Sequence, residues 1–92
     1  MALFIIERNF AQELSLDVDA GFVKGVLEIN ESCGVKWLTS FLSGDKRRTY
    51  CLYEALNPDA LREAARRANL PADAIIELAG EINPAKILRL AS

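Results

Sequence analysis

The stretch RTYCLYEALNPDALREAARRANLPADAIIEL, residues 48–78, predicts a strand, a helix and a second strand in that order. Its first part, residues 48–55, is rich in β-branched and aromatic residues, which is typical of a strand. Asn57 followed by Pro58 predicts a helix start, because Asn caps helices and Pro is favoured at the first helical position. The apolar run 74–78 predicts the strand that follows.

The preceding residues show the same kind of pattern. Residues 35–42 predict a strand, and the turn-forming residues 43–46 join it to the strand at 48–55 as a hairpin. Apolar residues recur at steps of three and four over residues 17–32, which predicts a helix. The short apolar run 3–8 predicts a buried strand.

The predicted order is therefore β-α-β-β-α-β, the arrangement of a ferredoxin-like α+β sandwich with two helices on one face of an antiparallel sheet. We place this domain at residues 1–79. The tail, residues 80–92, is too apolar to remain wholly in water, and we expect it to pack on the domain or on a dimer partner.

Composition narrows the possible functions. Of 92 residues, 51% are hydrophobic and 26% are charged, which is typical of one globular domain. Eleven Lys and Arg against thirteen Asp and Glu give a net charge of −2, so we expect no nucleic-acid partner, and residues 46–48 are interpreted as a solvated turn. No stretch has the length of a membrane span or the pattern of a signal peptide, so we expect a cytoplasmic protein without a membrane partner. Cys33 and Cys51 are expected to be reduced.

One face of the sheet should be left uncovered by the helices. By strand alternation it should carry residues of the first and third strands: Leu3, Ile5, Glu7, Tyr50, Leu52 and Glu54. If the hairpin turns at Gly44-Asp45, then Trp37, Thr39 and Phe41 join them. Because so much apolar surface is unusual for a monomer, we expect a homodimer that packs sheet against sheet as a dimeric α+β barrel.

Two glutamates are the chemical candidates on this face. Glu7 and Glu54 end the first and third strands, which we expect to be parallel neighbours, so their carboxylates would lie about 5 Å apart and repel each other. Arg8 and Arg89 are candidate cations between them. The pair could form a general acid/base or a cation site, or it could consist of two solvent-facing strand ends.

The segments TYCLYEA (49–55), NPDALREAA (57–65) and LPAD (70–73), together with VKWL (35–38) and IER (6–8), resemble a small bacterial domain-of-unknown-function family. That family includes nickel-binding, nickel-responsive proteins. The resemblance implies a ferredoxin-like fold, a homodimer and a link to nickel.

Histidine is absent from the chain, although nickel favours imidazole ligands. We therefore expect no bound cofactor, and Glu7, Glu54 and Cys51 are the candidate donors if nickel binds.

Three functions remain open. The first is a ligand-binding or metal-binding sensory homodimer with a pocket between the sheets. The second is a small cofactor-independent enzyme, of monooxygenase or isomerase type, that uses the carboxylate pair. The third is an interaction module. For the first, a small-molecule ligand would contact the following candidates: Glu7, Trp37, Thr39, Tyr50 and Glu54. Tyr50, Tyr53 and Trp37 could line such a pocket or belong to the core.

Overall fold

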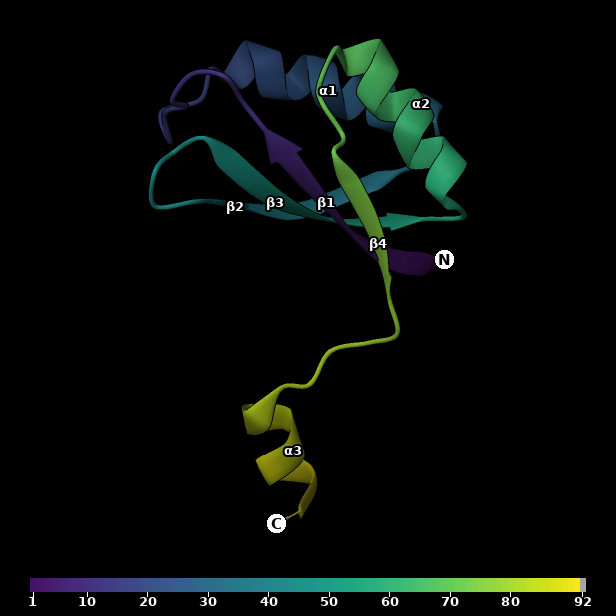
Figure 1. Cartoon of the computed structure of the whole chain (residues 1–92). Helices are drawn as coiled ribbons and strands as arrows, with labels where there is room; N and C mark the ends of the chain where they lie inside the picture. The colour runs from purple at the N-terminus through teal and green to yellow at the C-terminus, as the bar shows by residue number, and fades with distance from the viewer. Residues whose placement is uncertain (92) are drawn as a thin grey trace.

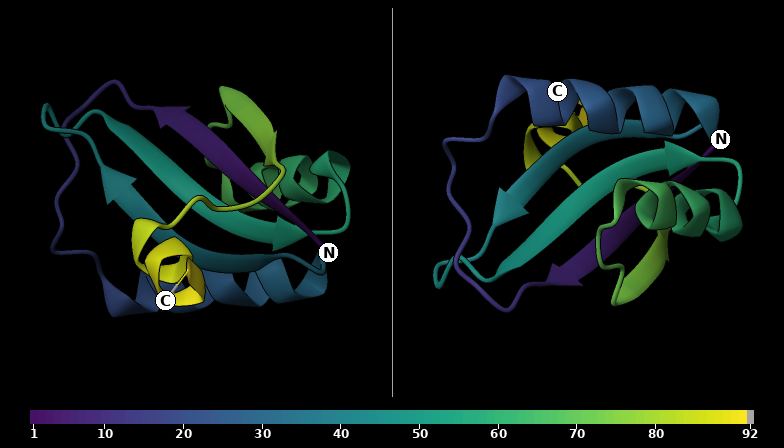
Figure 2. Two further views of the ribbon diagram at one scale, coloured as in Figure 1. Left: turned by 90° about the horizontal axis from the view of Figure 1, so that it is seen from below. Right: turned by 90° about the horizontal axis from the view of Figure 1, so that it is seen from above.

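The computed structural model describes residues 1–91 of the chain, and all elements below lie within them. They follow in the order β1 (Ala2–Asn9), α1 (Ala20–Ser32), β2 (Lys36–Leu42), β3 (Arg48–Ala55), α2 (Pro58–Ala68), β4 (Ala74–Leu78) and α3 (Pro84–Ala91). Helices α1 and α2 lie on one face of a four-stranded sheet and leave the other face free (Figure 1). Figure 2 shows the same layering from below and above. The predicted ferredoxin-like α+β fold is confirmed.

The strand order is β2-β3-β1-β4, and every neighbouring pair is antiparallel. The prediction that β1 and β3 run parallel is therefore wrong. The reason is the path of the chain. The α1 crossover carries the chain back along the sheet, so β2 runs in the direction of β1. The tight hairpin then reverses β3 against both.

Capping residues determine where α1 and α2, the two helices that cover the sheet, begin and where α2 ends. The Asp19 carboxylate accepts a hydrogen bond of 2.9 Å from the Phe22 backbone N–H, so α1 begins directly after Asp19, later than the expected residue 17. Asn57 caps α2 in the same way, through a 2.9 Å hydrogen bond from the Ala60 N–H. Asn69, with φ of 56°, ends α2 in the left-handed conformation.

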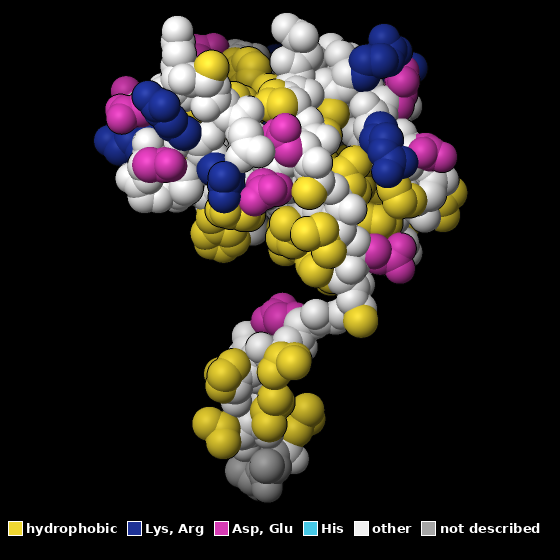
Figure 3. Space-filling view, viewed as in Figure 1, with side chains coloured by type: hydrophobic (Ala, Val, Ile, Leu, Met, Phe, Trp, Pro, Cys, Tyr) yellow, Lys and Arg dark blue, Asp and Glu magenta, His cyan; other side chains and the backbone are white. Residues whose placement is uncertain are grey.

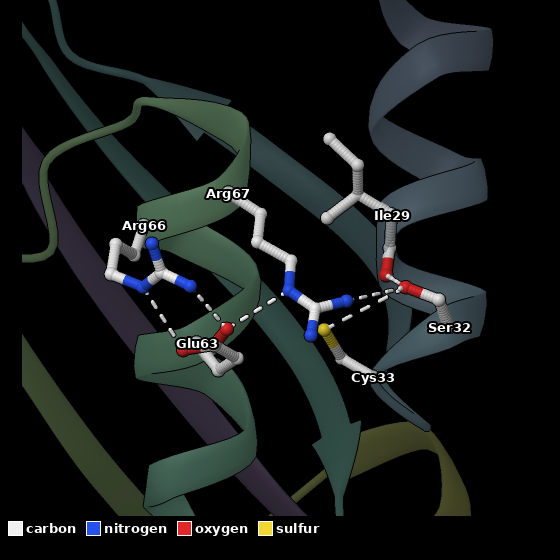
Figure 4. Close-up of polar contacts among 6 residues, drawn as sticks. All are labelled: Ile29, Ser32, Cys33, Glu63, Arg66 and Arg67. Atoms are coloured by element: carbon white, nitrogen blue, oxygen red, sulfur yellow. Dashed lines mark hydrogen bonds and ion pairs between the residues drawn. The ribbon is translucent and has the colours of Figure 1, made fainter.

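The core lies between the sheet and this helix layer. Its buried members come from the sheet, the α1–β2 junction and α2: Phe4, Ile6, Val35, Cys51, Tyr53, Ala55, Leu61 and Ala64. On the outer surface of the layer, Glu63 accepts hydrogen bonds from Arg66 and Arg67 (Figure 4). Arg67 also donates to the Ser32 hydroxyl at 3.3 Å, which connects α2 with the end of α1.

Helix α3 is set apart from the domain, on the side of the sheet opposite α1 and α2 (Figure 1). The tail therefore does not pack on its own domain, and packing on a partner stays a prediction. Apolar side chains gather both on the underside of the domain and around α3 (Figure 3). Within residues 1–91, no helix has the length and apolar character needed to cross a membrane.

Candidate functional site

The open face of the sheet, the face that α1 and α2 leave uncovered, carries four of the five predicted site residues. Glu7 pairs with Tyr50 across β1 and β3, Leu3 pairs with Glu54, and Thr39 on β2 pairs with Leu52. Paired residues in an antiparallel sheet project from the same face. The face predicted for these residues is therefore the one observed, and whether they bind a ligand stays a prediction.

Glu7 and Glu54 nevertheless do not meet. Their strands are antiparallel, so the two residues lie at opposite ends of the face, four residue steps apart along the strands. At the usual strand rise this is a separation of about 13 Å. The predicted 5 Å carboxylate pair is wrong, and with it the mutual repulsion that would have made one glutamate a proton carrier.

Glu7 has a different partner from either predicted arginine. Arg48 lies 3.6 Å from its carboxylate and reaches the Tyr50 hydroxyl at 3.4 Å. The hydrogen bond to Tyr50, and then the charge of Glu7, raise the pKa of Arg48 above its ordinary value. Glu7 and Arg48 thus form a partly exposed ion pair at this end of the open face, as charged residues at strand ends commonly do.

Trp37, the fifth predicted site residue, lies on the covered face. It pairs with Tyr53, whereas Thr39 pairs with Leu52, so Leu38 is an extra residue in β2. This β-bulge reverses the alternation on one side of it. The prediction that Trp37 shares the open face with Thr39 and Phe41 is therefore wrong. Its indole N–H donates to the Ser40 hydroxyl at 2.8 Å.

Trp37 instead lines a cleft of about 250 Å³ between the sheet and the N-terminal part of α1, a feature that the sequence patterns did not predict. The segment between β1 and α1 contributes Leu14 and Leu16 to its walls. The remaining walls are also mainly apolar and include Phe22, Val26 and Leu42. The cleft, called the α1 cleft below, is somewhat smaller than the roughly 300 Å³ at which pockets for drug-sized ligands begin.

Arg8 is the charged residue of the α1 cleft, and it is only 4% exposed. Its guanidinium donates to the Pro71 carbonyl and, at 3.0 Å, to the Tyr53 hydroxyl. Its central carbon lies 5.9 Å from the centre of the Tyr53 ring. Within residues 1–91 no carboxylate forms an ion pair with it. Arg8 was predicted as a partner of the glutamates, but it faces the other side of the sheet.

Tyr53 adds a second donor beside Arg8. Burial raises the pKa of Tyr53, and the nearby Arg8 only partly opposes this effect, so the phenol is protonated at neutral pH. Its oxygen accepts from Arg8, which leaves its own hydrogen without an acceptor among the described residues. The Ser40 hydroxyl is in the same position, since its oxygen accepts from Trp37. The polar groups of the cleft thus offer more donors than acceptors.

The family profile of the nickel-responsive SCO4226-like proteins matches residues 4–78, which is most of the chain. This chain belongs to the SCO4226-like family. The crystal structure of SCO4226 from Streptomyces coelicolor A3(2) is similar to it, with a TM-score of 0.77 and 20% sequence identity. The similarity covers 88% of this chain and all of that one. At this identity the likeness shows the fold alone. A comparison with curated proteins finds no match.

Proteins of the SCO4226-like family are nickel-responsive, but the candidate donors within this chain do not fit a nickel ion. Among residues 1–91, no three Cys, Asp or Glu side chains form a group that could hold a metal ion. Cys51 is buried on the covered face, whereas Glu7 and Glu54 lie at opposite ends of the open face. These three candidate donors therefore cannot converge on one ion within one chain.

A sequence signal for Arg8 was available. The alternation that puts Leu3, Ile5 and Glu7 on the open face puts Arg8, together with Phe4 and Ile6, on the covered face. A cation at such a position is unusual, because buried charges normally have a counter-charge. The sequence contains no comparable signal for the cleft, because the cleft depends on how the segment before α1 packs beside the β2–β3 hairpin, to which Phe10 and Leu14 are hydrogen-bonded.

Proposed function

We propose that this protein is a non-enzymatic, small-molecule-binding homodimer of the SCO4226-like family, with a sensory or accessory role. The observation that carries the proposal is the α1 cleft, which combines apolar walls with two hydroxyl donors, on Tyr53 and Ser40, that have no protein acceptor among the described residues. Concave, mostly apolar sites with a few convergent polar groups are the usual form of small-molecule sites. This location differs from the pocket between two sheets that the sequence patterns suggested.

The open face supports the homodimer. Ile76 on β4 and Phe41 on β2 are 53% and 64% exposed, and Leu3, Ile5 and Leu52 lie between them on the sheet. A contiguous apolar surface of this kind is rare on a monomer. A second copy of the chain, packed sheet to sheet, would bury it.

The α3 helix supports the same proposal. It lies on the open-face side, and Ile87, Leu88 and Leu90 are exposed on it. Residues beyond 78 also lie outside the family match, so this helix is an addition to the common domain. We propose that α3 adds to the dimer contact by packing on the partner.

An enzymatic alternative depended on the Glu7–Glu54 pair, which the antiparallel register separates. No other group of the described residues takes its place as a paired acid and base. Binding is therefore the better supported function.

Native mass spectrometry of the protein purified from its own host tests the proposal. We expect twice the chain mass, with one small molecule per subunit that is lost in denaturing solvent. The same spectrum would show any bound nickel. A dimer without any bound species, or a monomer, would contradict the ligand-binding or the dimeric part respectively.

A further inference from the structure

Given the proposed binding function, Arg8 indicates the chemical class of the ligand. A guanidinium has five N–H donors, and those of Arg8 find two acceptors, the Pro71 carbonyl and the Tyr53 hydroxyl. Both acceptors are neutral, so the buried positive charge has no counter-charge within residues 1–91.

A buried charge without a counter-ion is unfavourable, and a fixed donor cluster around it suits an anion. The Tyr53 hydroxyl has a hydrogen to donate, and it is already held beside the guanidinium at 3.0 Å. Together the two side chains present a planar cation and a neutral O–H donor. A carboxylate, with two acceptor oxygens, matches this pair in charge and hydrogen-bonding capacity.

The rest of the α1 cleft determines the body of the ligand. Phe22, Val26, Trp37 and Leu42 offer apolar and aromatic surface, and the volume of about 250 Å³ admits a small molecule only. A polyanion would leave charges against these walls. A cation would be repelled by Arg8, and a neutral apolar molecule would leave the donors unpaired.

We propose that the α1 cleft binds a small monocarboxylate with an apolar body, whose carboxylate pairs with Arg8 and Tyr53. The apolar body would lie against Trp37 and α1. This assigns Arg8 as a ligand-binding residue and separates the site from the open face.

Octanoate is a suitable probe, and 1-octanol is its matched neutral control because it has the same chain length. Trp37 is the only tryptophan of the chain and lines the cleft, so its fluorescence reports binding directly. Titrations at pH 7, below micelle formation, should show octanoate binding about tenfold or more tighter than 1-octanol. Octylamine should not bind.

Two arginine variants test the role of the charge. Arg8→Met should weaken octanoate binding about tenfold or more and leave 1-octanol binding unchanged. Arg48→Met removes the same charge from the open face, outside the cleft, and should leave both affinities unchanged. If Arg8→Met fails to fold, Tyr53→Phe gives a second test, since it removes only the hydroxyl and should weaken octanoate several-fold.

Thr49→Leu tests the location, because Thr49 lines the cleft and a larger apolar side chain would occupy it. Both probes should then lose binding. Equal affinity for octanoate and 1-octanol, or unchanged octanoate binding in Arg8→Met, would overturn the carboxylate assignment. Absence of binding by octanoate would overturn it too. If native mass spectrometry still finds another bound molecule in that case, the proposed function survives and only the ligand class is wrong.

Discussion

The covered and open faces of the sheet are built from the same strands, but only the covered face is completed within one chain. On β1, Phe4 and Ile6 are buried beneath the helices, whereas Leu3 and Ile5 on the other face are only partly buried. Toward the sheet edges the open face becomes more exposed, as Ile76 shows. Both faces are apolar, but the helices α1 and α2 cover only one of them.

We therefore expect residues of the covered face to determine the stability of one chain, and residues of the open face to determine its association with a second copy. Residues of the covered face contact α1 and α2 in every copy of the chain, so their contribution to the free energy of unfolding does not depend on protein concentration. Apolar residues of the open face are partly buried in one chain, and only a partner could bury them further. Their contribution should therefore depend on concentration, as expected for any interaction between subunits.

The largest effect is expected at Tyr53 on the covered face. Tyr53 is 3% exposed and accepts a hydrogen bond from buried Arg8, so Tyr53→Ala should lower the free energy of unfolding by about 3–5 kcal/mol. Urea unfolding at one fixed protein concentration, followed by circular dichroism, measures this loss.

Leu56→Ala provides the control for that prediction. Leu56 is an exposed hydrophobic residue between β3 and α2, so its replacement should change stability by less than about 0.5 kcal/mol. If Tyr53→Ala were equally mild, Tyr53 would not belong to the core, and the face assignment of β3 would be wrong.

The second prediction concerns the open face. Leu52 lies on β3, the strand between β2 and β1, and its side chain lies on this face. Leu52→Glu would bury a charge in a sheet-to-sheet interface and should weaken dimerisation about tenfold or more. Sedimentation equilibrium at micromolar concentration should show a dimer for the unchanged protein and mostly monomer for the variant.

Leu56→Glu introduces the same charge outside the sheet and should leave the dimer intact. The proposed dimer would be contradicted if the protein without substitutions sedimented only as a single chain. It would also be contradicted by a Leu52→Glu variant that remains fully dimeric.

Alternation and capping signals predicted much of this fold because they are local. Asn57 and Pro58 begin α2 for reasons contained in adjacent residues, and the period of two places Phe4 and Glu7 on opposite faces. The relative direction of β1 and β3 is not local, because it depends on the path of the crossover. The bulge at Leu38 has no Gly or Pro to mark it, so the side on which Trp37 lies could not be predicted from the sequence.

The third prediction concerns the outer surface of the helices that complete the covered face. Hydrogen bonds from Arg66 and then Arg67 lower the pKa of Glu63 to about 2. A lowered pKa means that the charged carboxylate stabilises the fold above the unfolded value, near 4.5, and that this contribution is lost as pH falls toward about 2. Glu63→Gln should therefore be less stable than the unchanged protein at pH 7, and the two should converge near pH 2.

The Glu63 side chain is 39% exposed and its arginine partners are more so, so the difference should be small and should shrink in 1 M salt. Urea unfolding at several pH values measures it. Glu28→Gln, on α1 and exposed, is a matched charge control, because Glu28 forms no ion pair among the described residues, and it should change the stability at pH 7 much less. A gap between Glu63→Gln and the unchanged protein that persisted at pH 2 would show that the arginine contacts are not its cause.

The smallest effect should be the coupling between Glu7 and Glu54. If the two carboxylates were 5 Å apart, their interaction would be about 3 kcal/mol at an effective dielectric of about 20. At opposite ends of the open face they should be independent, so the changes in the free energy of unfolding caused by Glu7→Gln and Glu54→Gln should add within about 0.5 kcal/mol.

A double-mutant cycle by urea unfolding measures the coupling. It is best performed at a protein concentration low enough for the chain to be monomeric, so that the carboxylate of another chain does not come close. A parallel cycle on Glu7 and Arg48, which lie 3.6 Å apart, calibrates the method and should give about 0.2–1 kcal/mol. A coupling between the glutamates above about 1 kcal/mol would mean that they meet within one chain, and it would restore the acid/base pair as a candidate site on the open face.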